Sequence, residues 1–458
     1  MEITIKNKLF LQDIPESLAK TIKGRLTFAN PKYLENERMG RWNGEIPEYL
    51  KFYEREGNSL IVPRGYIRQL IDLCKKNNVQ FQLNDKRRTL PEVSFSFNGK
   101  LRPFQAEAVE AMFAKDFGTL NAPTGSGKTV MALSLIAQRK QPALIVVHTK
   151  ELLNQWIDRI ETFLGIPKAE IGIIGAGKKI IGDKITIALV QTLYKCSCDI
   201  SKHIGHLIVD ECHRAPSRTF TEAATAFDSK YMLGLSATPW RRDKLSKLIF
   251  WHLGDVHYEI DKEDLQETGD ILEAEVITRE TDFIPYNDAT LEYGKMLSEL
   301  TQNEQRNHLI CGDVAAAARN GSGVCLVLSD RRNHCKALHD ILQNGFNQPS
   351  TVLTGDVPAK ERQDIVDRLN SDKIKVLVAT GQLIGEGFDY KGLSTLFLAT
   401  PISFSGRVIQ YLGRVLRPAP GKDKATVFDY IDVNVPVLVA SAGGRQKVYE
   451  TDEQSKIN

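Results

Sequence analysis

One short segment of the 458-residue chain combines glycines, a lysine and hydroxyl groups at a spacing that suits phosphate. Residues 122–129 read APTGSGKT, which is the P-loop pattern with Ala122 in place of the first glycine. Small residues let backbone N–H groups converge on phosphate oxygens at a helix N-terminus. Lys128 is then expected to neutralise the β- and γ-phosphates, and Thr129 to ligate Mg²⁺. The loop residues expected to contact the nucleotide are Pro123, Thr124, Gly125, Ser126, Gly127, Lys128 and Thr129.

Two adjacent carboxylates follow a second apolar run, Leu207–Val209. If this run is a strand, it delivers Asp210 and Glu211 to the carboxyl edge of a sheet, where the sites of α/β proteins lie. Asp210 suits a ligand of Mg²⁺, held directly or through water, and Glu211 suits the base that orients and deprotonates an attacking water. Cys212 and His213 follow directly, but no second Cys/His pair completes a zinc site.

The elements that must position these residues alternate between short β-branched runs, such as Ala143–Val147, and longer helical stretches. This alternation starts near residue 96 and predicts parallel sheets joined by crossover helices. The stretch is too long for one comfortable core. We therefore expect an α/β protein with three parts, a small α+β domain at residues 1–95 and parallel-sheet domains at 96–268 and 269–458. Residues 85–88 and 263–271 are the expected linkers.

The charge of the chain is unevenly distributed, although its formal total is only +3. Residues 1–95 contain 17 basic and 12 acidic side chains, whereas residues 273–458 contain 21 and 24. A near-neutral total does not exclude nucleic-acid binding, because a local basic surface is sufficient. No apolar run approaches the roughly 18 residues that span a bilayer. The seven cysteines are scattered, which fits a reducing cytoplasm.

Residues 210–213, Asp-Glu-Cys-His, resemble the DExH box of superfamily 2 helicases, and further segments resemble that family's motifs in the same order. The resemblance covers roughly residues 100–435 and implies two RecA-like motor domains that bind Mg·ATP between them. It implies that Gln105, within Leu101–Gln105, reads the adenine edge. Residues 236–239, Ser-Ala-Thr-Pro, resemble the motif that couples hydrolysis to movement, so His213, Ser236 and Thr238 are the expected coupling residues.

The segment from Gln410 to Arg417 resembles the family's arginine-finger motif. Gln410, Arg414 and Arg417 recur at spacings of four and three, which places them along one face if the segment is helical. Guanidinium groups there are expected to reach the γ-phosphate from the opposite domain. Residues 378–389 resemble a further motif, which implies nucleotide contacts at Gly387 and Asp389.

Nucleic acid is implied by the resemblance rather than by the total charge. Hydroxyl groups position a phosphate backbone without reading bases, so four threonines are candidate contacts: Thr149, Thr192, Thr354 and Thr380. Each also fits a capping or strand-edge role. The N-terminal segment contributes Arg38, Arg41 and Trp42, close together near two glycines. There the cations suit phosphates and an exposed ring suits an unpaired base.

The subfamily resemblance is to the XPB-like group and, through residues 30–44, to phage UvsW-type helicases. Those enzymes act on forks, Holliday junctions and displacement loops. Arg242 stands where the XPB-like group has an acid in its Arg-Glu-Asp motif. We expect an ATP- and Mg²⁺-dependent DNA helicase or translocase of replication, recombination or repair, acting on branched or duplex DNA as a monomer in a bacterial or phage-infected cytoplasm. The alternatives are a double-strand translocase that never separates strands, an RNA helicase, and a non-catalytic junction-binding protein.

Overall fold

A computed structural model shows that the chain folds into two compact units. The first unit comprises Met1–Ala122 and Gly127–Ile260, and the second comprises Pro123–Ser126 and Asp261–Asn458. The structure describes residues 1–214, 221, 223–237, 246–321, 323–371, 373–381, 384, 390, 392–402, 405–419, 422 and 424–450. No helix within these ranges is long and apolar enough to cross a membrane.

The N-terminal part is α+β, as predicted, and is built on a five-stranded sheet in the order β5-β6-β2-β1-β7. Alternating apolar residues form its strands, since Ile3, Ile5, Leu9 and Leu11 all point into the core. The strands are β1 (Glu2–Ile5), β2 (Lys8–Gln12), β5 (Glu54–Glu56), β6 (Ser59–Pro63) and β7 (Gln82–Asp85). The helical elements of the core are α1 (Glu16–Arg25), the 3-10 turn η1 (Arg64–Tyr66) and α3 (Ile67–Lys76).

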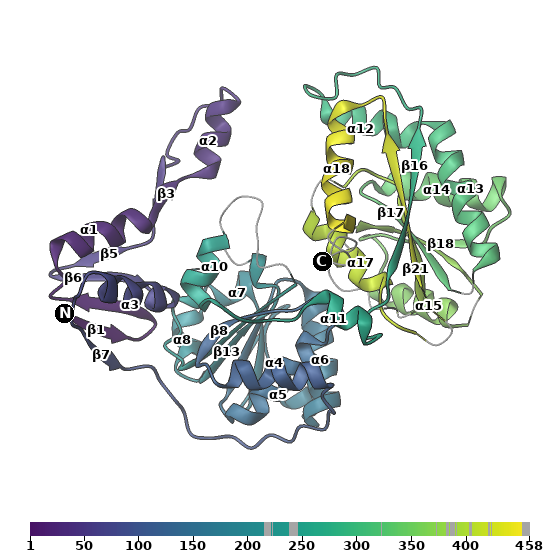
Figure 1. The fold of residues 1–458 in the computed structure, drawn as a ribbon. Helices are drawn as coiled ribbons and strands as arrows, with labels where there is room; N and C mark the ends of the chain where they lie inside the picture. Colours follow the sequence, from purple (N-terminus) through teal and green to yellow (C-terminus); the bar gives the residue numbers. More distant parts are fainter. Residues whose placement is uncertain are drawn as a thin grey trace. The chain divides into compact units, whose positions relative to one another are not determined.

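A small arm extends from this core (Figure 1). It consists of the two-stranded ribbon β3 (Thr27–Ala29) and β4 (Tyr49–Lys51) with the helix α2 (Pro31–Arg38) between them. Asn30 caps α2 by accepting a hydrogen bond from the Lys32 N–H, and Pro31 occupies the first helical position. No residue of α2 is buried, so much of the surface of the helix is open to solvent.

The expected linker at residues 85–88 is held by ion pairs. Arg87 bonds to Asp85 and, at 2.7 Å, to Asp116, while Arg88 pairs with Asp228. The chain then runs extended beneath the next sheet to α4 (Figure 1). Gln141 fixes this extended segment by exchanging two hydrogen bonds with the backbone of Leu90. The first part of the connection, as far as Leu90, is therefore anchored to the domain that contains the first parallel sheet.

The first parallel sheet has eight strands in the order β11-β10-β12-β9-β13-β14-β8-β15, and only β11, at its edge, is antiparallel. Its central strands are buried along their whole length, which is why they appear in the sequence as continuous apolar runs. The strands are β8 (Phe117–Asn121), β9 (Ala143–Val147), β10 (Gly172–Gly175), β11 (Lys178–Ile180), β12 (Ile185–Leu189), β13 (His206–Val209), β14 (Tyr231–Ser236) and β15 (Val256–Glu259). The helices are α4 (Pro103–Phe113), α5 (Lys128–Arg139), α6 (Lys150–Leu164), α7 (Val190–Leu193), α8 (Ser197–Ser201) and α10 (Ser246–Leu253), with 3-10 turns η2 (Lys168–Glu170) and η3 (Cys212–Arg214).

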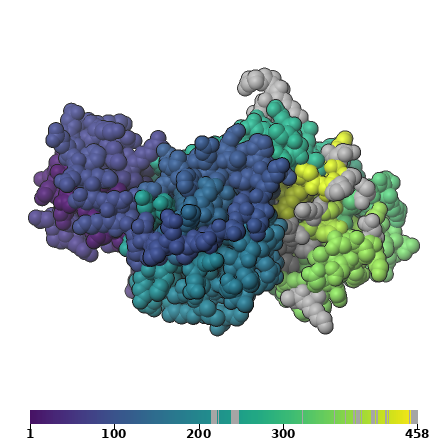
Figure 2. All heavy atoms as spheres, turned by 90° about the horizontal axis from the view of Figure 1, so that it is seen from below, coloured from purple at the N-terminus to yellow at the C-terminus, as the bar shows by residue number. Residues whose placement is uncertain are grey.

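Helix α10 belongs to two cores at once. Ile249 and Leu253 pack into the core of the parallel sheet, whereas Leu248 and Trp251 complete the core of the N-terminal part. Arg64, buried in η1, donates to the Ser229 carbonyl at 2.8 Å. Figure 2 shows the N-terminal residues as a lobe that abuts the first parallel-sheet domain. The two parts therefore form one packed body, and the N-terminal core is incomplete without α10.

The second unit contains a six-stranded sheet in the order β16-β21-β20-β17-β19-β18, in which every pairing is parallel. Together with the first sheet it confirms the predicted α/β class. The strands are β16 (Ala274–Thr281), β17 (Val324–Ser329), β18 (Ser350–Leu353), β19 (Val376–Thr380), β20 (Leu393–Leu398) and β21 (Ala425–Asp432). The helices are α11 (Lys262–Glu267), α12 (Tyr293–Gln302), α13 (Glu304–Asn320), α14 (Arg332–Gly345), α15 (Ala359–Asn370), α17 (Ser405–Val415) and α18 (Pro436–Glu450). Most of the expected linker at 263–271 is thus helical, in α11.

Two buried ion pairs fix helices of the second unit to β21. Arg306 of α13 bonds to Asp432 at 2.7 Å, and Arg445 of α18 bonds to Asp429 at 2.8 Å. All four side chains are at most 2% exposed. Removing one partner of such a pair leaves an uncompensated buried charge, so these pairs hold the two helices in a defined position on the sheet.

The junction on α10 gives a first prediction. A Cβ at Gly65 would overlap the Phe250 carbonyl and lie 2.7 Å from that of Trp251, both of which are backbone atoms. We expect Gly65→Ala to lower the free energy of unfolding by roughly 1–3 kcal/mol through overpacking, and to expose the junction to limited proteolysis. Gly24→Ala is the matched control, because no atom lies within 4 Å of its Cβ and Ala favours the helix. Equal stability and protease resistance of the two variants would contradict the prediction.

Candidate nucleotide and nucleic-acid sites

The predicted phosphate loop connects β8 to the N-terminus of α5, as the sequence implied. Gly125 and Gly127 have φ values of +97° and +87°, which only glycine adopts without strain. Gly127 directly precedes α5, so the positive end of the helix dipole faces the loop, where it favours phosphate. Ala122 is buried and its backbone does not have positive φ, which explains why alanine is tolerated where the pattern has glycine.

Internal hydrogen bonds hold the loop and its lysine. Ser126 Oγ donates to the Pro123 carbonyl at 2.8 Å, and Lys128 Nζ donates to the Ala122 carbonyl at 2.9 Å. Ala122 N in turn bonds to the carbonyl of Ser236 at the end of β14. The ammonium group is therefore kept at the mouth of the loop, where we expect it to exchange this carbonyl for phosphate oxygens.

Gln105 lies against the same loop. It is buried in the first turn of α4, and its Oε1 accepts a hydrogen bond from the Arg102 N–H at 3.0 Å. A Cβ at Gly127 would come within 2.5 Å of its Nε2. The amide is thus oriented by α4 and lies beside the N-terminus of α5, a position compatible with the adenine role that the resemblance implies.

Asp210 and Glu211 leave the carboxyl end of β13. Only β14 separates β13 from β8 in the parallel sheet, so the carboxylates and the phosphate loop emerge at the same edge. Glu211 adopts a left-handed backbone with φ of +50°, and its N–H bonds to Asp210 Oδ1 at 2.9 Å. Such a conformation in a non-glycine residue costs roughly 1–3 kcal/mol and is concentrated at functional sites.

Trp156 of α6 holds the buried carboxylate of Asp210. The indole Nε1–H donates to Asp210 Oδ2 at 2.8 Å, and Asp210 itself is 7% exposed. Burial, and secondarily the charge of Glu211, raise the pKa of Asp210 to about 6, against which the Trp156 bond acts. Trp156 was not predicted from the sequence, because nothing in its spacing within α6 distinguishes it from a core tryptophan.

His213 connects the carboxylates to β14. Its Nδ1 lies 3.1 Å from Ser236 Oγ and 3.2 Å from Glu211 Oε2, and both His213 and Ser236 are buried. One imidazole thus connects Glu211 to the end of β14. This arrangement places two of the three predicted coupling residues together, while Thr238, the third, lies outside the described residues.

The residues at this edge fit a magnesium–nucleotide complex. A buried carboxylate beside a second carboxylate, with a raised pKa, is the kind of group that a divalent cation stabilises. Mg²⁺ in nucleotide sites takes one or two carboxylates and relies on phosphate oxygens for other ligands, which matches Asp210 and the Thr129 hydroxyl. Bound Mg²⁺ would supply charge neutralisation at the phosphates. Lys128 would bind and orient them, and Glu211 would accept the proton of the attacking water.

The candidate arginine fingers lie at the end of α17 in the second unit. Arg414 is within the helix and 8% exposed, but α17 ends at Val415, so Arg417 lies beyond it. The prediction that Gln410, Arg414 and Arg417 share one helix face is therefore wrong for Arg417. Lys422 explains this ending, because its ammonium group donates to the carbonyls of Val415 and Arg417 and caps the helix.

Three further nucleotide-site predictions remain untested. Gly387 and Asp389 lie outside the described residues, and Gln410 is described in its backbone only. The segment Arg241–Asp243 also lies outside them.

The four candidate threonines occupy different local settings. Thr149 is the N-cap of α6, where its Oγ1 accepts from the Leu152 N–H at 3.2 Å. Thr192 is half-buried in α7, Thr354 is buried just after β18, and Thr380 ends β19. Thr149 and Thr192 belong to the first unit, and Thr354 and Thr380 to the second. A contact of each with a phosphate backbone stays a prediction.

The N-terminal candidates are all at the surface. Trp42 is 91% exposed, which is unusual for a tryptophan. Arg38 and Arg41, close to it in the sequence, are exposed as well. Arg38 ends α2, whereas Arg41 and Trp42 follow it in the turn before β4. Tyr66, by contrast, is completely buried in the N-terminal core. The arm therefore presents an exposed aromatic ring and two exposed cations within five residues of the chain.

Comparison with known proteins gives two family matches. Residues 98–241 match the family described as "Type III restriction enzyme, res subunit", and residues 297–419 match "Helicase conserved C-terminal domain". The phosphate loop and the carboxylates fall in the first match, and Arg414 and Arg417 fall in the second.

Three relatives cover most of the chain. A protein of Acanthamoeba polyphaga mimivirus named as a putative ATP-dependent RNA helicase is 26% identical over 95% of this chain and 82% of its own length. The ATP-dependent DNA helicase uvsW of Enterobacteria phage T4 is 25% identical over 95% of this chain and 91% of its own. The DNA 3'-5' translocase XPB2 of Sulfurisphaera tokodaii is 27% identical over 71% and 80%.

The buried charge of Asp210 gives a second prediction. Because its folded pKa is raised from 3.8 to about 6, the ionised form destabilises the apo protein at neutral pH. We expect Asp210→Asn to raise the free energy of unfolding by on the order of 1–3 kcal/mol at pH 8 while abolishing Mg²⁺-dependent ATP hydrolysis. This gain should shrink as the pH falls through 6 and vanish near pH 4. Thermal unfolding of both proteins without nucleotide, from pH 4 to 8, tests it, and a destabilised variant at pH 8 would contradict it.

The Trp156 bond gives a third prediction. Trp156→Phe keeps the ring but removes the donor that lowers the pKa of Asp210. Loss of a hydrogen bond to a charged group, roughly 1.5–3 kcal/mol, should shift the acidic limb of the ATPase pH profile upward by about one unit or more. An unshifted limb with reduced activity at every pH would instead indicate a packing defect only.

Proposed function

We propose that this chain is an ATP-driven superfamily 2 helicase that remodels branched DNA, and that the two segments matching helicase-type families, residues 98–241 and 297–419, form its ATP-dependent part. Forks, four-way junctions and displacement loops of replication, recombination or repair are its expected substrates. The helicase domains alone leave open both the choice of DNA and its branched form. ATP binds at the phosphate loop and the adjacent carboxylates described above.

The observation that carries the proposal is the N-terminal arm with its exposed Trp42. Branched DNA differs from plain duplex in offering unpaired bases beside duplex phosphates. An exposed indole suits the bases and the neighbouring Arg38 and Arg41 suit the phosphates. The arm belongs to the same compact unit as the first parallel sheet, so DNA held by it has a defined place relative to the first motor domain. The phage T4 relative, named as a DNA helicase, matches 95% of the chain, which supports the assignment.

Two other activities are supported by single observations. The family match over residues 98–241 is to a restriction-enzyme subunit, and the first alternative is accordingly a duplex translocase that does not separate strands. The mimivirus relative is named as an RNA helicase. Both alternatives use the same nucleotide site, so only the nucleic-acid preference distinguishes them from the proposed activity.

The fourth prediction compares nucleic acids. We expect ATP hydrolysis by the intact protein to be stimulated more by forked and four-way-junction DNA than by duplex or by the matching RNAs, with strand displacement on the branched substrates. Trp42→Ala should weaken binding to these junctions about 5- to 100-fold, because stacking on one base contributes roughly 1–3 kcal/mol. Hydrolysis without nucleic acid should not change.

Lys128→Ala is the control that removes hydrolysis but leaves the arm intact. Displacement of a triplex strand without separation of a fork would identify a duplex translocase. Stronger stimulation by RNA than by DNA would overturn the assignment of DNA. A wild-type protein that binds junctions yet hydrolyses no ATP with any of these substrates would be a binding protein only.

A further inference from the structure

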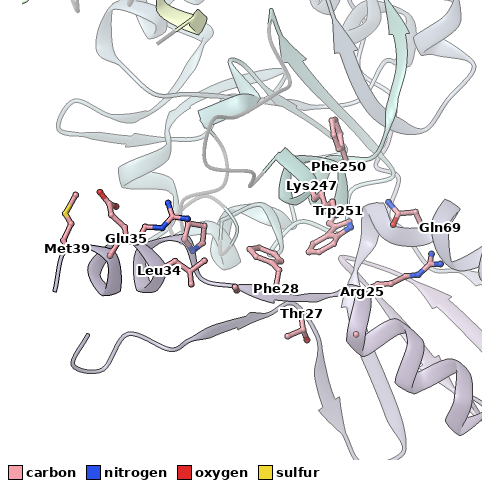
Figure 3. A pocket seen from close by; sticks show the side chains of 14 residues that line it. Arg25, Thr27, Phe28, Leu34, Glu35, Met39, Gln69, Lys247, Phe250 and Trp251 are labelled. Atoms are coloured by element: carbon pink, nitrogen blue, oxygen red, sulfur yellow. The ribbon is translucent and has the colours of Figure 1, made fainter. Parts of the chain in front are cut away.

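A large groove lies between the N-terminal arm and α10, inside the first unit (Figure 3). Its volume is about 1280 Å³, above the roughly 300–1,000 Å³ of small-molecule sites. One wall comes from α1, β3 and α2, and the other from Lys247, Phe250 and Trp251 of α10. A groove of this size, open at the surface, suits a segment of a polymer better than a small ligand.

Aromatic rings form the floor of the groove. Phe28 and Trp251 have ring centroids 6.1 Å apart, and Figure 3 shows both side chains lining the same stretch of the groove. Phe52 stacks on Phe28 at 5.4 Å with an interplanar angle of 8°, and it also contacts Trp251 at 5.6 Å. Tyr66 meets Trp251 edge-on from the buried side. The floor is therefore braced by core residues and does not have to be ordered when a ligand binds.

Cations dominate the charged residues of the groove. Arg25, Arg38 and Lys247 line it and are exposed, and Glu35 is the single acid among the lining residues. Within the described residues, none of the three cations forms an ion pair. Arg25 and Arg38 come from the N-terminal part and Lys247 from the motor domain. Positive charge therefore lines both walls above an aromatic floor.

We propose that this groove binds an unpaired DNA strand, with bases against Phe28 and phosphates on Arg25, Arg38 and Lys247. The inference rests on the proposed function and specifies where one strand of a branched substrate lies. A polyanion with exposed π-faces matches both features of the groove, whereas an acidic peptide matches only its cations. Bases of an intact duplex are already stacked on one another, so the aromatic floor selects single strands. Since both walls belong to one packed body, the strand is held at a fixed place beside the first motor domain.

The fifth prediction uses two variants that probe the aromatic floor and the cations separately. Phe28→Leu keeps the apolar volume but removes the ring, and should weaken binding of a fluorescent oligothymidylate about 5- to 100-fold without changing its salt dependence. The double variant Arg25→Glu with Lys247→Glu should weaken binding and reduce the slope of log K against log salt by roughly 0.7 for each phosphate that is no longer neutralised. Fluorescence anisotropy at several salt concentrations measures both effects.

Matched controls make the same changes outside the groove. Phe10→Leu alters a half-buried ring of β2, and the double variant Lys20→Glu with Lys76→Glu reverses two exposed charges on α1 and α3. Both controls should bind the oligonucleotide as the wild type does. Thermal unfolding of all four variants shows whether Phe28→Leu remains folded. If Phe28→Leu is unfolded, the double variant Arg25→Glu with Lys247→Glu still tests the groove, because both of its residues are exposed.

Photocrosslinking locates the strand directly. An oligonucleotide carrying 5-iododeoxyuridine, irradiated with the wild-type protein, should give adducts on peptides that contain Phe28 or Phe250–Trp251. Adducts confined to other peptides, or groove variants that bind like the controls, would overturn the proposal. A protein dimer that the groove variants abolish would identify a second copy as the occupant instead.

The groove and the proposed function fail in different ways. If the wild type does not remodel forks but the groove variants lose oligonucleotide binding, the proposed function fails and the groove assignment stands. If the wild type remodels forks and the groove variants bind and remodel equally well, the groove assignment fails alone.

Discussion

The first unit is organised around one constraint, which is to keep Asp210 buried and still able to ionise. Desolvation and the neighbouring Glu211 both oppose the charge, and the Trp156 N–H is a neutral donor that supports it. A flexible site would admit water, and the pKa of Asp210 would then return toward its ordinary value. The continuous parallel sheet prevents that, because β13 is enclosed by β9 and β14 and all its residues are buried. A divalent cation at this edge would neutralise the carboxylate, and the phosphate loop two strands away would hold the phosphates that supply its other ligands.

The same sheet also supports the N-terminal part, from its opposite end. Phe117, which begins β8, contacts the guanidinium groups of Arg64 and Arg87, each 5.4 Å from its ring centroid. Burial lowers the pKa of Arg64 to about 9, so this guanidinium is costly to bury and its contacts must be kept in place. One strand therefore leads from the N-terminal junction directly into the phosphate loop. The N-terminal part is better regarded as an extension of the first motor domain than as an appended module, because Leu248 and Trp251 would lose their cover without it.

The sequence allowed the motifs and the fold class to be predicted, because both depend on local patterns. Glycines before a helix, carboxylates after an apolar run and alternating strands and helices are visible along the chain, and the phosphate loop and the two carboxylates do emerge at the same edge of the sheet. Contacts between segments distant in the chain were not predictable. Trp156 lies 54 residues from Asp210, and its role depends on how α6 crosses the sheet. Arg417 was placed on a helix face because spacing alone cannot show that Lys422 ends α17 before it.

The cations of the groove are a second example of distant residues whose proximity the sequence did not show. Counting by segment places the basic excess in residues 1–95, and Arg25 and Arg38 belong there. Lys247, however, belongs to a segment of nearly balanced charge, yet it faces the same groove. A binding surface is defined by what the fold brings together, and here α10 carries both a core residue of the N-terminal part and a cation of the groove. The helix whose Leu248 and Trp251 complete the core of the N-terminal part thus also supplies one wall of the groove, so the two walls belong to one compact unit.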